Sequence, residues 1–172
     1  MSQIRIDGVR DWICIAASAT NGSLMHRIDP VATTHTSGTA HHFALLLLRI
    51  AIAMVFLYHG SAILFGAFGG PGPERFAAFI HAPALVGYLV GLAQFAGGLA
   101  MLTGVFMRIG AACIMIVMLG AIFMVHLRHG FDVTKGGVEY ALTQFLLAFA
   151  LLLAGSGRYS LSSMLPAALR RL

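Results

Sequence analysis

The stretch that decides the fold is residues 42–65, HFALLLLRIAIAMVFLYHGSAILF. It holds one charged side chain, Arg49, and is followed by the glycine- and proline-rich residues 66–73, GAFGGPGP. A helix of about 20 apolar residues crosses the hydrocarbon core of a bilayer, because each residue adds about 1.5 Å of length. The run therefore predicts a membrane-spanning helix, and the segment after it predicts a loop.

The composition of the whole chain agrees with a membrane protein. Of its 172 residues, 59% are hydrophobic and only 10% are charged, whereas a soluble domain carries roughly 25% charged residues. The net charge of +5 comes mostly from basic residues in loops and tails, and no nucleic-acid-binding motif accompanies it, so no nucleic-acid partner is expected. Cys14 and Cys113 lie far apart in sequence and predict no dithiol centre.

Three further apolar runs follow the first one, at residues 83–105, 109–127 and 138–154. Between the first two, Pro73 suits a first helical turn, and residues 74–81 predict a short helix from Glu74 to His81. Phe76, Phe79 and Ile80 share one side of it, which is typical of a helix lying in the membrane interface. The sequence thus predicts an all-α membrane protein: residues 41–161 form a four-transmembrane-helix bundle with one interfacial helix.

The ends of the chain are polar. Residues 1–40 are predicted to be a disordered cytoplasmic leader and residues 162–172 a short cytoplasmic tail. Both Met1 and Met25 are candidate translation starts. With four spans, seven Lys and Arg residues fall on the side of the two tails and three on the opposite side. The positive-inside rule then predicts that both termini are cytoplasmic.

Small residues line one face of the second predicted span. Gly87, Gly91 and Gly98 share this face with Gln94, because they are separated by multiples of about one helical turn. Such glycines allow another helix to approach closely. Gln94 is therefore expected to face a neighbouring helix. There it either stabilises helix packing through an interhelical hydrogen bond, or it is a hydrogen-bond partner of Arg49 or of a bound carbonyl.

Arg49 is the strongest single indication of a special role, since a charge within a span is costly. It lies about seven residues, or roughly 10 Å, from one end of its span. Two interpretations are open. The side chain extends to the near interface, or it faces the bundle interior with a structural or functional role.

The remaining candidates gather at the opposite mouth of the predicted bundle: His59, His126, His129, Glu139 and Tyr140. Imidazoles and a carboxylate in one place can bind a metal or relay protons. They also suit interfacial capping, with Glu139 favoured at a helix N-terminus and Tyr140 in the aromatic belt. No metal-binding signature occurs, so no metal site is predicted, and the capping interpretation is preferred.

Six stretches resemble the DoxX family of bacterial membrane proteins: LLLLRIAIAMVFLYHG, FGGPGPERFAAFI, GGLAMLTGVFMRIGA, VHLRHGF, GGVEYAL and GSGRYSL. The similarity covers residues 43–161 and implies four spans in the bacterial inner membrane. The matched positions are Arg49, His59, Arg108, His129, Gly137, Glu139, Tyr140 and Arg158. The chain departs from many relatives at Ile63, Gln94 and Lys135, where they carry lysine, a carboxylate and asparagine.

The resemblance implies a function as well as a fold. The DoxX family takes its name from similarity to a subunit of a thiosulfate:quinone oxidoreductase. Some members of the family are membrane partners of a superoxide dismutase or a sulfurtransferase. The expectation is therefore a membrane subunit or anchor of a quinone-linked redox or oxidative-stress complex, with quinone as the implied cofactor; no haem or flavin signature occurs. The alternatives are a non-catalytic membrane scaffold and a small transporter.

Overall fold

The computed structural model describes residues 38–164 and 166, which belong to one compact unit of residues 37–172. Most of the predicted leader, with Cys14 and Met25, and most of the predicted tail lie outside the described residues. The first element is helix α2, Gly38–Phe65. It ends where Gly66 adopts a left-handed backbone conformation with φ 67°, which a residue with a side chain rarely adopts.

The segment after α2 is more ordered than the glycines and prolines predict. A short 3₁₀ turn, Ala67–Gly69, leads into helix α3, Gly72–Phe79, which has a proline in its first turn. Helix α4, Ala84–Thr103, begins after Pro83 and ends at Gly104, whose φ is 74°. The amphipathic element therefore exists between the first two long helices, and it begins two residues earlier than the predicted start at Glu74.

The second half of the unit is a helical hairpin. Helix α5, Met107–Ala121, continues through a π-helical turn, Ile122–His126, and a 3₁₀ turn, Leu127–His129. Another 3₁₀ turn, Val133–Lys135, precedes helix α6, Glu139–Ala154, and the last described turn is Leu161–Met164. The α6 bounds agree closely with the predicted run of residues 138–154. We name residues 130–139, which run from the end of the 3₁₀ turn Leu127–His129 to the first residue of α6, the rim loop.

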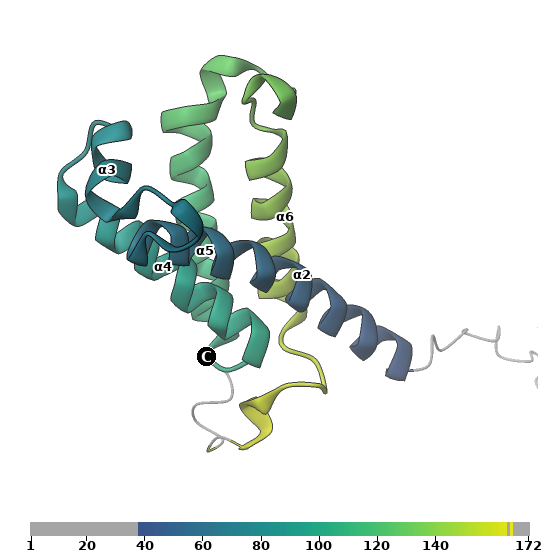
Figure 1. Ribbon diagram of the computed structural model, residues 1–172. Coiled ribbons are helices and arrows are strands. Elements are labelled where there is room, and N and C mark those ends of the chain that lie inside the picture. Colours follow the sequence, from purple (N-terminus) through teal and green to yellow (C-terminus); the bar gives the residue numbers. More distant parts are fainter. Residues whose placement is uncertain (1–37, 165, 167–172) are drawn as a thin grey trace, which may run out of the picture. The chain divides into compact units, whose positions relative to one another are not determined.

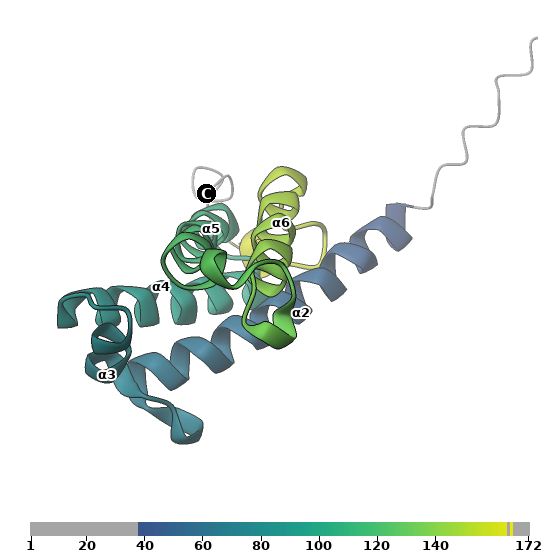
Figure 2. The same cartoon turned by 90° about the horizontal axis from the view of Figure 1, so that it is seen from above.

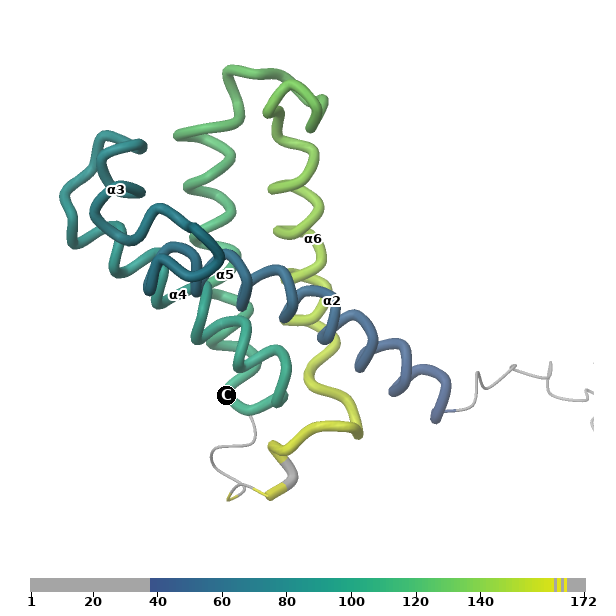
Figure 3. The backbone as a smooth tube through the Cα atoms, viewed as in Figure 1, coloured from purple at the N-terminus to yellow at the C-terminus, as the bar shows by residue number. Residues whose placement is uncertain are grey.

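The helices of this unit form two antiparallel pairs (Figure 1). Helix α4 packs along α2, and α6 packs along α5, while α4 and α5 are joined by a three-residue turn and pack against each other. Seen from above, α5 and α6 lie side by side and α2 runs obliquely across them (Figure 2). The backbone trace shows the same crossing (Figure 3).

Close approach of α2 and α4 depends on glycine. A Cβ on Gly60 would overlap the backbone of Phe95, and one on Gly98 would lie 2.9 Å from the backbone nitrogen of Leu57. Gly91 of α4 lies against Ile63 and Leu64 of α2. Gly87 of α4 instead lies against Pro73 and Ala77, which belong to α3. The predicted small-residue face of the second span therefore contacts two different elements.

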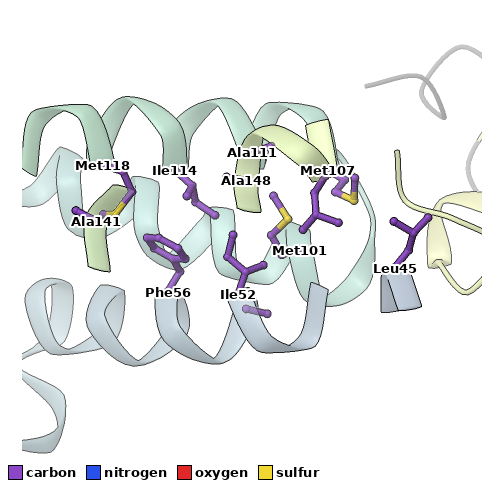
Figure 4. Packing of buried hydrophobic residues seen from close by; sticks show 12 residues of the cluster. Leu45, Ile52, Phe56, Met101, Met107, Ala111, Ile114, Met118, Ala141 and Ala148 are labelled. Carbon is purple, nitrogen blue, oxygen red and sulfur yellow. The ribbon is translucent and has the colours of Figure 1, made fainter. Parts of the chain in front are cut away.

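The core sits where the two pairs cross (Figure 4). Ile52 and Phe56 of α2 point toward Met101 of α4 and Ile114 of α5, and each is at most 1% exposed. Small residues from α5 and α6, such as Ala111 and Ala148, let the backbones approach this cluster. Fully burying a large apolar side chain is worth about 1.5–3 kcal/mol relative to water, and in a bilayer the close packing itself supplies the attraction.

The outer surface of the unit is apolar, as a bilayer requires. Large hydrophobic side chains are exposed on every long helix, for example Met54, Leu85, Ile116 and Leu153, each 67–69% exposed. Such a surface marks a membrane protein. Three helices of the described residues are long and apolar enough to span: Gly38–Phe65, Ala84–Thr103 and Met107–His129. Helix α6, with 16 residues, is shorter, so an all-helical membrane protein is confirmed and the fourth span stays a prediction.

Candidate functional site

Arg49 is buried inside the unit, near the end of α4, and is 1% exposed. Its guanidinium makes four hydrogen bonds, all of them to backbone carbonyl oxygens. The Nε atom donates to Met101 at 2.9 Å and Nη2 to Leu102 at 3.0 Å, both in the last turn of α4. The Nη1 atom donates to Ser156 at 2.8 Å and to Tyr159 at 2.6 Å, after the end of α6. We name this arrangement the Arg49 clamp.

The clamp explains why a cation can be buried there. The last four carbonyl groups of a helix lack partners within the helix and carry the negative end of its dipole. Arg49 therefore satisfies orphan acceptors of α4 and ties them to the segment after α6. Gly104 is part of this geometry, because a Cβ there would lie 2.6 Å from Nη2 of Arg49. Of the two interpretations of Arg49, the structure places the side chain in the interior, bound to backbone.

Gln94 is also buried, at 6% exposed, and its own backbone lies against Gly60 of α2. It is not among the four acceptors of Arg49. A second buried amide, Gln144 of α6, is 8% exposed, and its Oε1 atom is buried without a hydrogen-bond partner among the described residues. Gln144 was not among the residues predicted from the sequence, although it carries the same signal as Gln94: a lone amide in an apolar run.

The polar residues predicted at the opposite mouth do not form one cluster. His59 is exposed, and its ring lies 6.5 Å from that of Tyr140 and 5.4 Å from that of Tyr58. These three rings form an aromatic group between α2 and the start of α6. Tyr58 in turn stacks on Phe68 at 5.0 Å. His59 is therefore placed in an aromatic setting, between the end of α2 and the start of α6.

His126, Glu139 and Asp132 instead hold the rim loop. The Nδ1 atom of His126 lies 2.6 Å from the carbonyl oxygen of Gly136, and Oε2 of Glu139 accepts the Val133 amide at 3.1 Å. Asp132 accepts from both the amide and the hydroxyl of Thr134, and these bonds hold the pKa of its carboxyl below the ordinary value. These side chains fold ten residues into a fixed connection.

Gly137 shows how tightly the rim loop is built. A Cβ at this position would lie 2.5 Å from the carbonyl carbon of Phe131 and 2.6 Å from the oxygen of Gly130. The amide of Val138 donates to Gly130, and that of Glu139 donates to Phe131, both at 3.0 Å. The loop therefore closes on itself before α6 begins, which gives Gly137 a structural reason to be glycine.

His129 lies neither in the aromatic group nor among the side chains that hold the rim loop, but at a groove on the surface. Its Nδ1 atom lies 3.0 Å from the carbonyl oxygen of Val125, one turn back along the chain. It lines a groove of about 580 Å³ between the end of α3 and the π-helical turn after α5. The residues that line this groove are Phe79, Ile80, His81, Phe123, Met124, Val125, Arg128 and His129.

The arrangement bears on which cofactors the predicted residues could hold. Within the described residues, no three His, Cys, Asp or Glu side chains lie close enough to share a metal ion. The three polar side chains predicted at this mouth, His59, His129 and Glu139, each contact a different part of the structure. His59 contacts Tyr140, His129 lines the groove, and Glu139 holds the rim loop.

Comparison with known families identifies the first part of this unit. Residues 44–127 match the DoxX domain. This chain belongs to the DoxX family. The match runs from α2 to the π-helical turn, so it includes Arg49, His59, Gln94 and His126. His129, Glu139 and Tyr140 lie beyond its end. No curated protein and no solved structure matched the chain significantly.

Proposed function

We propose that this DoxX protein is the membrane anchor of a redox or oxidative-stress complex whose chemistry is carried out by a partner. The single observation behind this proposal is where the polar side chains of the predicted site direct their bonds. Arg49 bonds to four backbone carbonyls, and His126 and Glu139 bond to the backbone of the rim loop. These groups maintain the fold, so electrons and substrate would come from the partner.

The clamp and the rim loop suit an anchor for a physical reason. A docking surface is most effective when it is rigid before binding, because less conformational entropy is lost in the complex. The rim loop is fixed by side-chain bonds and exposes Phe131 and Val133, 64% and 47% exposed. At the other end, the segment after α6 is tied to α4 through Arg49. Both ends therefore present ordered backbone beyond the apolar helices.

Site-specific photo-cross-linking in native membranes tests the anchor role. A photoreactive residue at position 133 probes the rim loop, and one at position 161 probes the opposite end. Position 116, on the exposed face of α5, serves as the matched control, since its side chain is 69% exposed on the apolar surface. The expected result is a cross-link to a redox enzyme, such as a superoxide dismutase or a sulfurtransferase, from position 133 or 161 and none from 116.

A second measurement tests the quinone link. Reduction of ubiquinone or menaquinone is followed with the purified chain alone, with the cross-linked partner alone, and with both together. The proposal expects quinone reduction only when both are present. Quinone reduction by the chain alone would contradict the anchor role, and a chain that cross-links to no other protein would contradict complex formation.

A further inference from the structure

The groove lined by the end of α3 and the turns after α5 is not used by the anchor role. Its walls are mostly apolar: Phe79 and Ile80 on one side, and Phe123, Met124 and Val125 on the other. Its volume of about 580 Å³ falls within the range of roughly 300–1,000 Å³ that is typical of small-molecule sites. Phe79 and Phe123 are each 67% exposed, so these walls are open to a ligand.

Two backbone irregularities create the groove. Phe123, Met124 and Val125 all belong to the π-helical turn, which widens the helix locally; such turns are frequent at functional sites. On the other side, His81 has a φ of 55°, a conformation that residues with side chains rarely adopt. This bend lies just after the end of α3, beside Phe79 and Ile80, which form that wall of the groove.

The polar part of the groove is entirely basic. Arg128, His81 and His129 are the polar side chains in its lining, and none of its eight lining residues is acidic. Within the described residues, Arg128 makes one hydrogen bond, from Nη2 to the carbonyl oxygen of Met124 at 3.2 Å. Its remaining N–H groups point to no protein acceptor in this part of the chain, and a guanidinium is well suited to bind phosphate oxygens.

The groove lies at the end of a membrane-spanning helix. The apolar stretch Met107–His129 is long enough to cross the bilayer, and Arg128 is in its last turn. Arginines at such positions place their charge at the level of the lipid head groups. Helix α3, whose Phe79 and Ile80 form the opposite wall, is the short amphipathic element next to it. Apolar walls and a basic mouth are thus combined at the depth where a phospholipid changes from acyl chain to head group.

We propose that this groove binds an anionic phospholipid, with the guanidinium of Arg128 on the phosphate and an acyl chain along Phe79 and Phe123. The argument for this occupant is charge complementarity together with the position of the groove at the membrane boundary. His81 and His129 border the head group and supply further hydrogen bonds. The lipid site goes beyond the anchor role and stands whether or not a redox partner binds elsewhere.

The test is native mass spectrometry of the purified full chain in detergent, titrated with phosphatidylglycerol or with zwitterionic phosphatidylcholine. The wild type is expected to retain phosphatidylglycerol preferentially. Arg128→Gln is expected to weaken phosphatidylglycerol binding about fivefold to tenfold and to leave phosphatidylcholine binding unchanged, because one cation near a membrane surface contributes an attraction of that order. Since Arg128 is exposed, the thermal unfolding midpoint of the Arg128→Gln protein should equal that of the wild type.

Arg75→Gln is the matched control, because Arg75 is an exposed arginine of α3 that does not line the groove. If Arg75→Gln weakened phosphatidylglycerol binding as much as Arg128→Gln does, the proposal would be overturned. Equal binding of the two lipids by the wild type would also overturn it. Phe123→Ala, on the apolar wall, should weaken phosphatidylglycerol binding about threefold through lost apolar contact. A competition measurement adds inorganic phosphate or ubiquinone to the lipid-bound wild type at matched concentration. Displacement of the lipid by either compound would assign the groove to another ligand and overturn the lipid proposal.

Discussion

At the end of the unit where α4 turns into α5, a single guanidinium holds four carbonyl oxygens from two chain segments. At the end where α5 leads to α6, the polar side chains act separately: His59 among aromatic rings, His126 and Glu139 within the rim loop, and Arg128 and His129 at the groove. The first arrangement uses four of the five N–H donors of the guanidinium and leaves little for a ligand. The second leaves N–H donors of Arg128 without an acceptor in the part of the chain that the structure describes, at the groove. Buried polarity alone therefore does not identify a binding site; unused hydrogen-bonding capacity is the better guide.

Removing the clamp should give the largest effect. Arg49→Ala leaves four carbonyl oxygens without their donor, two of them at the end of α4. An unsatisfied buried group costs about 1–3 kcal/mol, so a loss of about 3–5 kcal/mol in unfolding free energy is expected, measured by denaturant titration in detergent. Arg49→Lys, with fewer donors, should recover part of it. Arg108→Ala, an exposed control, should change stability little; a clamp variant as stable as this control would contradict the structural role.

Widening the α2–α4 contact should give the next largest effect and tests whether close packing supports the clamp. In Gly60→Ala the new methyl group meets the backbone of Phe95, so the helices must separate. A loss of about 1–3 kcal/mol is expected. Gly120→Ala is the matched control, because nothing lies within 4 Å of a Cβ there, and it should stabilise α5 by up to about 1 kcal/mol. Equal effects from both substitutions would show that this contact is not tight.

Gln144 sharpens the contrast between satisfied and unsatisfied polar groups. Gln144→Met replaces an amide whose Oε1 is buried without a partner in the described residues by an apolar side chain of similar size. Removal of the unpaired group should raise the unfolding free energy by about 1 kcal/mol. Thr143→Val, on the exposed side of α6, should change it by less than about 0.5 kcal/mol. Destabilisation by Gln144→Met would indicate that a bridging water satisfies the amide.

The smallest effect concerns the rim loop and depends on pH. The Thr134 bonds lower the pKa of Asp132 below its ordinary value of 3.8. A carboxyl with a depressed pKa stabilises the folded loop above its unfolded pKa, and this contribution is lost as the pH falls through the lower folded value. Amide exchange at Thr134 should therefore accelerate as the pH falls below about 3.8, beyond the intrinsic change. In Asp132→Asn the protection should not vary with pH; a similar pH response there would rule out Asp132 as its source.

The sequence predicts the helices well and the roles of their polar residues poorly, for one physical reason. Helix bounds depend on local features: apolar runs and the glycines that end them, as at Gly66, Gly104 and Gly155. The acceptors of Arg49 depend on tertiary structure, since Met101 and Ser156 are 52 and 107 residues away. No periodicity within residues 42–65 indicates where another helix will end.

The opposite mouth shows the same limit. The sequence predicts that four polar residues lie together because all of them fall at helix ends: His59, His126, His129 and Glu139. The position of a helix end can be read from the local sequence. The π-helical turn of Ile122–His126 and the closed rim loop then place them in separate surroundings. A π-helical turn inside an apolar run leaves no clear pattern in the sequence, so the groove could not be predicted. Gln144 could have been found, since its signal equals that of Gln94.

The length of α2 has a consequence for the membrane around it. Its 28 residues extend about 42 Å at 1.5 Å per residue, whereas the hydrocarbon layer is roughly 30 Å thick. The polar first residues of α2, 38–42, extend beyond the layer, and the apolar residues 43–65, about 35 Å long, fit within it when inclined by about 30°. Helix α2 does run obliquely to α5 and α6 (Figure 2). The 16-residue α6, about 24 Å long, is instead too short for the same layer. The inclination of α2 therefore matches its long apolar stretch to the hydrocarbon layer without thickening the bilayer around it.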